Sequence, residues 1–315
     1  MRKILITGGA GNIGGSLARR LAMQPNNHIT IVDNFSTGDR VKLPARSNGN
    51  WELICADVNN KDDITSIMTT RGFDYVFHYA AVVGVKRTLS RPSCVLDDIN
   101  GIKNVLNAAK NTSVKRVFYS SSSEVYGEPF EIPQREETTP LNSRLPYAIV
   151  KNVGEAFCRT YSQDFNQDYT IFRFFNTYGP LQSDDFVVSK FIKLALLGNE
   201  ISIFGPGSQT RTFCYIDDNL DFTELVLNNG DLINETVNVG NNHEITVMDL
   251  AQTVLKVSGS RSTITHLPPL LEGDMSRRCP DISRMLSIIN KPLIALEDGL
   301  GRTIAAYRNS LNAIT

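Results

Sequence analysis

Long hydrophobic runs and an excess of charge of one sign are both missing from this sequence of 315 residues. No stretch approaches the roughly 20 apolar residues that span a bilayer, and the apolar run Ile4 to Ile6 is too short for a secretory signal. Lysine and arginine number 32 against 33 acidic residues, a net charge of -1, which argues against a general nucleic-acid or membrane-surface binder. We therefore expect a soluble, cytoplasmic protein without nucleic-acid or membrane partners.

Cysteine and histidine are also scarce. The five cysteines are scattered and contain no C-x-x-C pair, and the four histidines stand far apart without a metal-ligand spacing. Reduced thiols are the expected state. We predict neither a metal site nor a histidine-based hydrolase.

Short apolar segments alternate with longer amphipathic ones up to about residue 175, the pattern of strands and helices in a parallel sheet. The candidate strands are Lys3 to Thr7, His28 to Asp33, Trp51 to Ala56, Tyr75 to Tyr79, Arg116 to Ser120 and Thr170 to Phe175. The candidate helices are Gly14 to Met23, Lys61 to Thr70, Val95 to Thr112 and Pro146 to Asp168. This order predicts an α/β fold with a Rossmann-type doubly wound parallel sheet, whose ligands bind beyond the carboxyl ends of the strands.

Beyond residue 176 the alternation gives way to loops rich in Gly, Pro, Ser and Arg. At about 150 residues per domain, the length fits two parts. We predict a sheet domain over residues 1–175 and a smaller α/β substrate-binding part over residues 176–315, with a cleft between them. Whether the chain crosses between the two parts stays open.

A glycine-rich turn follows the first predicted strand and precedes the first predicted helix, in the segment TGGAGNIG. Glycine lets the backbone turn tightly and approach a pyrophosphate, and the helix N-terminus offers free N–H groups and a positive dipole end to the phosphates. A flexible turn would show the same glycines. We assign to cofactor binding Gly8, Gly11, Asn12, Ile13 and Gly14.

A carboxylate, Asp33, ends the second predicted strand about 20 residues beyond the glycines. At that position it can accept both hydroxyls of an adenosine ribose and would repel a 2′-phosphate, which favours NAD over NADP. Asn34 follows it, and Asp57 with Val58 follows the third strand, where they would flank the adenine. The alternatives are a helix-capping aspartate at 33 and an ordinary loop aspartate at 57.

Tyr147 and Lys151 are four residues apart and so lie on one face of a predicted helix. A nearby ammonium and a cationic cofactor would favour the phenolate of Tyr147, which could then exchange a proton with a substrate hydroxyl. The run SSSSE follows an apolar strand at its carboxyl end, where the Ser122 hydroxyl can bond the same substrate group. A surface helix pair and a polar turn are the alternatives.

Together these motifs resemble the extended short-chain dehydrogenase/reductase family, specifically its nucleotide-sugar epimerases, dehydratases and decarboxylases. The resemblance covers nearly the whole chain and includes TGGAGNIG, DNFSTG, HYAA at residues 78–81, SSSSEVYG, YAIVK, RFFNTYGP, GSQTRTFCYIDD and RRCPDI. It implies Ser122, Tyr147 and Lys151 as the catalytic triad. It also implies tightly bound NAD, contacted by Ala80, Tyr147 and Lys151.

The resemblance further implies a nucleotide-diphosphate sugar as substrate. Asn176, Arg211 and Arg278 fall where relatives contact the diphosphate, with surface salt bridging as the alternative for the two arginines. The sugar contacts implied in this way are Val85, Lys86 and Ser123.

Family members commonly form homodimers through a four-helix bundle, here from the helices within Val95 to Thr112 and Pro146 to Asp168.

Two departures from the family pattern stand out. Asp98 replaces a common asparagine, and the loop GPLQSDDF replaces an arginine-bearing GPRQ. Hydrogen bonding near the cofactor and contacts to the sugar or phosphates are expected to differ there.

The resemblance implies a first step in which Tyr147 takes the proton of the sugar 4-hydroxyl while hydride passes to NAD, giving a 4-keto sugar. The fate of that ketone stays open: decarboxylation of UDP-glucuronate, 4-epimerisation, dehydration, or release by a net C4 dehydrogenase of a hexose or heptose. Glu124, a possible base beside the ring, favours decarboxylation or dehydration unless it merely holds a loop. A non-catalytic NAD-binding regulator is disfavoured because Ser122, Tyr147 and Lys151 are all present.

Overall fold

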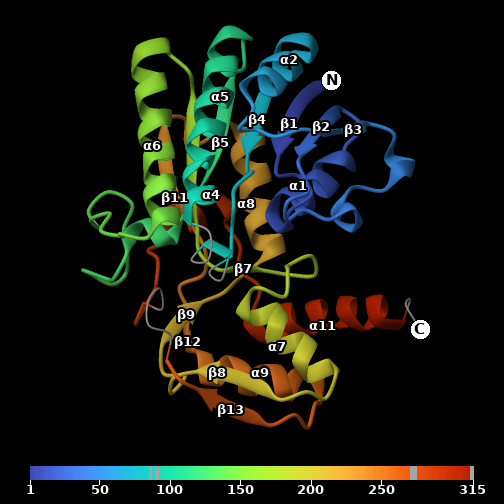
Figure 1. Ribbon diagram of the computed structural model, residues 1–315, viewed down its shortest axis with the longest axis vertical. Helices are drawn as coiled ribbons and strands as arrows, with labels where there is room; N and C mark the ends of the chain where they lie inside the picture. Colours follow the sequence, from blue (N-terminus) through green and yellow to red (C-terminus); the bar gives the residue numbers. More distant parts are fainter. Residues whose placement is uncertain (85–86, 89–91, 270–274, 313–315) are drawn as a thin grey trace.

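A seven-stranded parallel sheet forms the centre of the computed structural model, which describes residues 1–84, 87–88, 92–269 and 275–312 (Figure 1). The strand order is β11-β6-β5-β4-β1-β2-β3. The strands are β1 Arg2–Thr7, β2 Asn27–Asp33, β3 Trp51–Cys55, β4 Tyr75–His78, β5 Arg116–Ser122, β6 Tyr169–Phe174 and β11 Glu235–Val239. The predicted doubly wound α/β sheet is confirmed.

Helices cover both faces of the sheet because its strands are apolar on both sides. Successive strand residues point to opposite faces: Leu5 joins Val76 and Val117 in the core under α2, α5 and α6, whereas Ile4 and Ile6 join the core under α1 and α8. These helices are α1 Asn12–Ala22, α2 Lys61–Arg71, α5 Asp98–Asn111, α6 Pro146–Phe165 and α8 Ile216–Asn229.

The prediction of one continuous helix from Val95 to Thr112 is wrong. The structure has two helices there, α4 Pro92–Leu96 and α5 from Asp98, with Asp97 between them. Aspartate favours helix starts over interiors because its short side chain bonds nearby backbone groups. The Asp98 carboxylate accepts a hydrogen bond from the N–H of Val82 at 2.7 Å, so it faces the loop after β4.

The smaller part of the molecule lies beyond the carboxyl ends of the sheet strands, at the bottom of Figure 1. Its helices α7 Val187–Leu196 and α9 Val247–Ser258 pack together, and α11 Leu296–Asn312 packs against both. Its short strands pair two by two: β7 Thr177–Tyr178 with β10 Cys214–Tyr215, β8 Ile201–Phe204 with β13 Ile264–Leu267, and β9 Thr210–Thr212 with β12 Glu244–Thr246.

The chain crosses from this smaller part back to the sheet. Both α8 and the edge strand β11 come from beyond residue 176, and β11 pairs with β6. The remaining elements are α10 Ser283–Ile289, which packs against α8, and the 3-10 turns η1 Arg40–Lys42, η2 Arg46–Asn48 and η3 Ser123–Tyr126. Within the described residues no helix has the length and apolar character to cross a membrane. The same residues include no group of three or more His, Cys, Asp or Glu that could hold a metal.

Candidate active site

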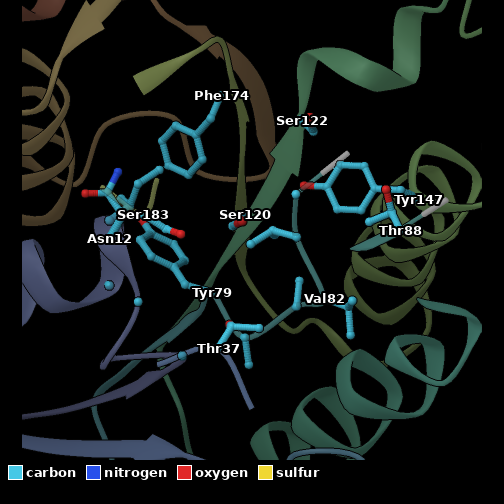
Figure 2. A pocket seen from close by; sticks show the side chains of 18 of the residues that line it. Asn12, Thr37, Tyr79, Val82, Thr88, Ser120, Ser122, Tyr147, Phe174 and Ser183 are labelled. Carbon is cyan, nitrogen blue, oxygen red and sulfur yellow. The ribbon is translucent and has the colours of Figure 1, made fainter. Parts of the chain in front are cut away.

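A cavity of about 350 Å³ opens at the carboxyl ends of the central strands and is lined by both parts of the molecule. This position is the one that a doubly wound sheet offers to a ligand, and the size is that of a ligand pocket. Figure 2 shows Tyr147 pointing into the cavity from one side, with Tyr79 and Phe174 opposite it. The rings of Tyr79 and Phe174 contact each other edge to face, 5.7 Å between centroids.

The glycine turn forms one wall of the cavity. Gly8 has a φ of +68°, and a Cβ on it would lie 2.6 Å from the backbone nitrogen of Ala80. A Cβ on Gly14 would lie 2.4 Å from the carbonyl oxygen of Gly8. Gly11 precedes α1, and no side chain caps that helix, so the N–H groups of its first turn are available to an anion. Asn12 lines the same wall, and its buried Oδ1 has no hydrogen-bond partner.

The end of β2 and the turn after β3 form the next wall. The buried Asp33 carboxylate accepts the N–H of Ala10 at 2.9 Å and that of Phe35 at 2.8 Å, which leaves further lone pairs for ribose hydroxyls. Asp57 accepts a hydrogen bond from the Asn34 amide at 3.3 Å. The structure therefore brings these predicted cofactor residues together.

All the predicted cofactor residues except Lys151 line the cavity. The close-packed glycines, the uncapped start of α1, the orphaned Asn12 oxygen and the available Asp33 lone pairs suit a dinucleotide with a free ribose 2′-hydroxyl. The residues present thus fit NAD.

The catalytic candidates meet where β5 ends beside the start of α6. Tyr147, one residue after the Pro146 that begins α6, lies near Ser122, and both residues line the cavity. Lys151 lies one turn further along, buried, and its Nζ donates to the Ser120 carbonyl at 2.6 Å. That Nζ is 5.7 Å from the centroid of the Tyr147 ring. Proline suits a helix start, since it fixes φ and lacks the N–H that would stay unpaired there.

Burial sets the protonation of this pair in the protein alone. It raises the pKa of Tyr147, and the charge of Glu124 adds to the rise, while the Ser122 hydrogen bond and Arg278 oppose it. Burial also lowers the pKa of Lys151 to about 8, against the attraction of Asp98. A tyrosine in this setting is neutral at pH 7 and becomes a base only when positive charge is added beside it.

An ion pair between buried Arg278 and partly buried Glu124 adjoins the tyrosine. Arg278 Nη1 lies 2.9 Å from Glu124 Oε1 and 3.4 Å from Ser123 Oγ. Glu124 Oε2 and Arg278 Nε are buried and have no hydrogen-bond partner. Sequence reasoning placed Glu124 at the sugar and Arg278 at the diphosphate, whereas the structure puts the two against each other on the cavity wall.

Of the other predicted substrate residues, one lines the cavity, one does not, and two lie outside the described residues. Asn176 lines the cavity and donates to the Thr212 carbonyl at 3.0 Å. Arg211 lies in β9, donates to the Thr210 carbonyl at 2.7 Å and is not part of the cavity lining. Val85 and Lys86 fall outside the described residues.

Sequence reasoning missed an ion pair at the cavity that joins residues far apart in the sequence. Arg87, after β4, lies 2.9 Å from Asp185, which precedes α7, and both residues line the cavity. Asp185 belongs to the loop GPLQSDDF, which departs from the family pattern. This departure was the available sequence signal that Asp185 has a particular role. No local motif indicates its partner across the cavity.

Comparisons with known proteins agree with this geometry. Residues 4–240 match the model of the NAD dependent epimerase/dehydratase family. The chain is 33% identical to UDP-N-acetyl-alpha-D-glucosaminuronate decarboxylase of Bacillus cytotoxicus, over 99% of both chains, and 34% identical to UDP-glucuronic acid decarboxylase 1 of Danio rerio, over 98% of this chain and 73% of that one. The crystal structure of UDP-glucose 4-epimerase from Thermotoga maritima with UDP-glucose superposes with a TM-score of 0.92 at 28% identity, covering 98% of this chain and 99% of that chain. The chain belongs to the NAD-dependent epimerase/dehydratase family of extended short-chain dehydrogenases/reductases, and it is an NAD-dependent enzyme of the nucleotide-sugar epimerase/dehydratase type.

Proposed function

We propose that this enzyme oxidises C4 of a nucleotide-activated hexuronate and then releases the C6 carboxylate as carbon dioxide. The observation that carries the proposal is the Arg278–Glu124 ion pair beside Tyr147, in which Arg278 is buried, Glu124 is partly buried and each side chain has one buried polar atom without a partner. Two of the similar proteins, those of Bacillus cytotoxicus and Danio rerio, are named as decarboxylases of nucleotide-linked uronates. A carboxylate entering this cavity needs a cation, because an unpaired buried charge is costly.

The first step uses the residues at the end of β5 and the start of α6. Tyr147 takes the proton of the C4 hydroxyl, and Ser122 holds that hydroxyl by a hydrogen bond. Lys151 supplies positive charge near the phenol ring, which favours the phenolate. Bound NAD supplies a hydride acceptor for C4 and a donor that can return the hydride. Gly8, Asn12 and Asp33 belong to the set of residues that would hold it.

The second step follows from the chemistry of the 4-keto sugar. In a 4-keto uronate the C6 carboxylate is β to the ketone, so the C5–C6 bond breaks with release of carbon dioxide and the electron pair passes into a C4–C5 enolate. Protonation of C5 restores the ketone, and return of the hydride to C4 restores the alcohol. Arg278 orients the carboxylate through a charge-assisted hydrogen bond. Glu124 holds Arg278 in place and faces the ring.

The test is the mass of the product from UDP-glucuronate and UDP-N-acetylglucosaminuronate, with UDP-glucose as the control and no added NAD. The proposal expects loss of carbon dioxide from a uronate and no decarboxylation of UDP-glucose. An unchanged mass with a new chromatographic peak would indicate epimerisation. Loss of water or of two hydrogens would indicate a dehydratase or a net dehydrogenase. Each of these three results overturns decarboxylation.

Variants separate the two steps. Tyr147→Phe should abolish turnover and keep the bound dinucleotide, which is measured by releasing it from denatured protein; full activity would refute the role of Tyr147. Arg278→Met should abolish carbon dioxide release from the uronate. The matched control is Arg277→Met, since Arg277 is exposed and pairs with Glu244. Equal loss in both arginine variants would contradict a specific role for Arg278.

We also propose that the enzyme forms a homodimer through α5 and α6. The two helices pack side by side, and α6 exposes Ile149 and Phe165 at 44% and 49%, which is apolar surface that a second copy would cover. Light scattering of the purified protein at micromolar concentration should give twice the mass of the chain. A monomer mass would refute this assembly.

A further inference from the structure

Lys42 is a buried lysine on the cavity wall that the proposed reaction does not use. It is the last residue of the turn η1, in the loop after β2, and only 9% of it is exposed. It lines the cavity together with Asn12 and Asp33. Among the residues that the structure describes, its ammonium has no hydrogen-bond partner and no ion-pair partner. Burial of an unpaired ammonium is costly, so this position is suited to an anionic ligand.

A guanidinium on α1 holds the backbone of this turn in place. Arg19 donates from Nε to the Lys42 carbonyl at 3.0 Å and to the Leu43 carbonyl at 3.1 Å. Its Nη2 donates to the Val41 carbonyl. One side chain thus binds three consecutive carbonyls of the turn, and the backbone position of Lys42 is set by the protein itself.

The lysine leaves this turn beside the start of α1. A Cβ on Gly15, in the first turn of the helix, would lie 2.9 Å from the Lys42 carbonyl oxygen and 3.1 Å from the Lys42 Cβ. Glycine at position 15 therefore permits this close approach. No side chain caps α1, so the free N–H groups and positive dipole end of the helix attract phosphate at the same place.

The two carboxylates nearest to the lysine are bonded to backbone groups. Asp39 accepts the Val41 N–H at 3.0 Å, and the Asp33 carboxylate accepts two backbone N–H groups. Burial lowers the pKa of Lys42, and the charges of Asp39 and Asp33 oppose the lowering. In the described parts of the chain neither carboxylate forms an ion pair with Lys42. They favour the charged ammonium and leave its donors to a ligand.

We propose that Lys42 binds the adenosine-side phosphate of the NAD pyrophosphate through a charge-assisted hydrogen bond from its ammonium. The adenosine side is favoured because the loop of Lys42 begins directly after Asp33, the residue suited to the adenosine ribose. A phosphate is favoured over a ribose hydroxyl because an anion offsets the burial of a cation and a neutral hydroxyl does not. The inference uses NAD as the cofactor of this enzyme type and is independent of the fate of the 4-keto sugar.

The test is the exchange of bound NAD in the purified full chain, incubated with excess isotope-labelled NAD and analysed by mass spectrometry after denaturation. Lys42→Met keeps most of the apolar stem and removes the charge, so exchange should become about 10- to 100-fold faster. The matched control is Arg40→Met, which removes the same charge from an exposed residue of the same turn that is not part of the cavity lining. It should leave the exchange rate unchanged. Equal rates in Lys42→Met and the unchanged protein would overturn the proposal.

Competitors identify the group that the lysine contacts. Adenosine, 5′-AMP and 2′-AMP are each added to the NAD-bound protein, and the concentration that displaces half of the NAD is measured. The ratio of this concentration for 5′-AMP to that for adenosine should rise about 10-fold in Lys42→Met, because adenosine lacks the phosphate. An unchanged ratio would overturn the phosphate contact. A rise for 2′-AMP in place of 5′-AMP would overturn the assignment to the pyrophosphate.

A charge-retaining variant separates the loss of charge from a loss of structure. Lys42→Arg keeps a cation at this position, so its NAD exchange should be slower than that of Lys42→Met. Equally fast exchange in the two variants would count against the role of the charge. Circular dichroism confirms the fold of each variant, and Lys42→Gln replaces Lys42→Met in both assays if the latter does not fold. None of these readouts involves turnover, so failure of the proposed decarboxylation would leave them unchanged.

Discussion

The contact between the glycine turn and the end of β4 permits a quantitative test of how the cofactor wall is built. Gly8 and Gly49 have almost the same φ, +68° and +69°, so alanine carries the same left-handed penalty of about 1–2 kcal/mol at both positions. The two sites differ in their surroundings. A Cβ at residue 8 would lie 2.6 Å and 2.7 Å from the backbone N and Cα of Ala80, whereas a Cβ at residue 49 meets nothing within 4 Å.

Gly49→Ala should therefore cost about 1–2 kcal/mol. Gly8→Ala should cost that amount plus about 1–3 kcal/mol for overpacking against backbone that has no rotamer to change. The assay is urea unfolding of both variants side by side, together with the amount of NAD released on denaturation. Gly8→Ala should also lose bound NAD, because its new methyl group separates two walls of the cavity. Equal unfolding free energies and equal NAD content in the two variants would refute the reasoning.

Three further predictions follow from buried groups. Arg173→Met should cost about 3–5 kcal/mol in urea unfolding, because Glu155 is fully buried and loses its two hydrogen bonds of 2.8 Å to that guanidinium; near-unchanged stability would contradict this. Burial lowers the pKa of His78 from 6.5 to about 3, so the unfolded state binds more protons between these values and stability falls as the pH drops through that window. His78→Asn should flatten this fall in melting temperatures measured from pH 7 to pH 4, and an equally steep fall would disprove it. Asp33→Asn should weaken NAD binding and reduce the preference for NAD over NADP, both measured by fluorescence titration. An unchanged ratio of the two affinities would show that Asp33 does not select the cofactor.

The sheet could be predicted from the sequence because its signals are local. Each of the six predicted strands is present within two residues of its predicted ends, since a buried parallel strand is a short apolar run bounded by polar turns. The seventh strand, β11, was missed as part of the sheet. Glu235–Val239 reads ETVNV, which is polar at alternate positions, and its pairing with β6 comes from a chain crossing that no local pattern encodes.

The candidate site also has parts that local sequence motifs predict and parts that they do not. The glycine turn, Asp33 and the Tyr147–Lys151 spacing are contiguous or near-contiguous motifs, and the fold brings the glycines, Asp33 and Tyr147 to one cavity. The Arg278–Glu124 pair joins residues 154 positions apart. The sequence analysis selected the two residues from separate motifs and assigned Glu124 to the sugar and Arg278 to the diphosphate. Their mutual contact depends on how the smaller part packs on the sheet, which residue types alone do not determine.

The charges around Tyr147 determine what its proposed role as a base requires. Glu124 and Asp98 both raise the pKa of Tyr147, burial raises it most, and Arg278 together with the Ser122 hydrogen bond lowers it only in part. Each carboxylate is itself opposed by one buried cation, Arg278 for Glu124 and Lys151 for Asp98. The effects that raise the pKa of Tyr147 outweigh those that lower it, so the protein alone keeps Tyr147 protonated. Bound oxidised nicotinamide would add positive charge that favours the phenolate. In the reaction proposed above, proton removal by Tyr147 would then be linked to the cofactor state that can accept a hydride.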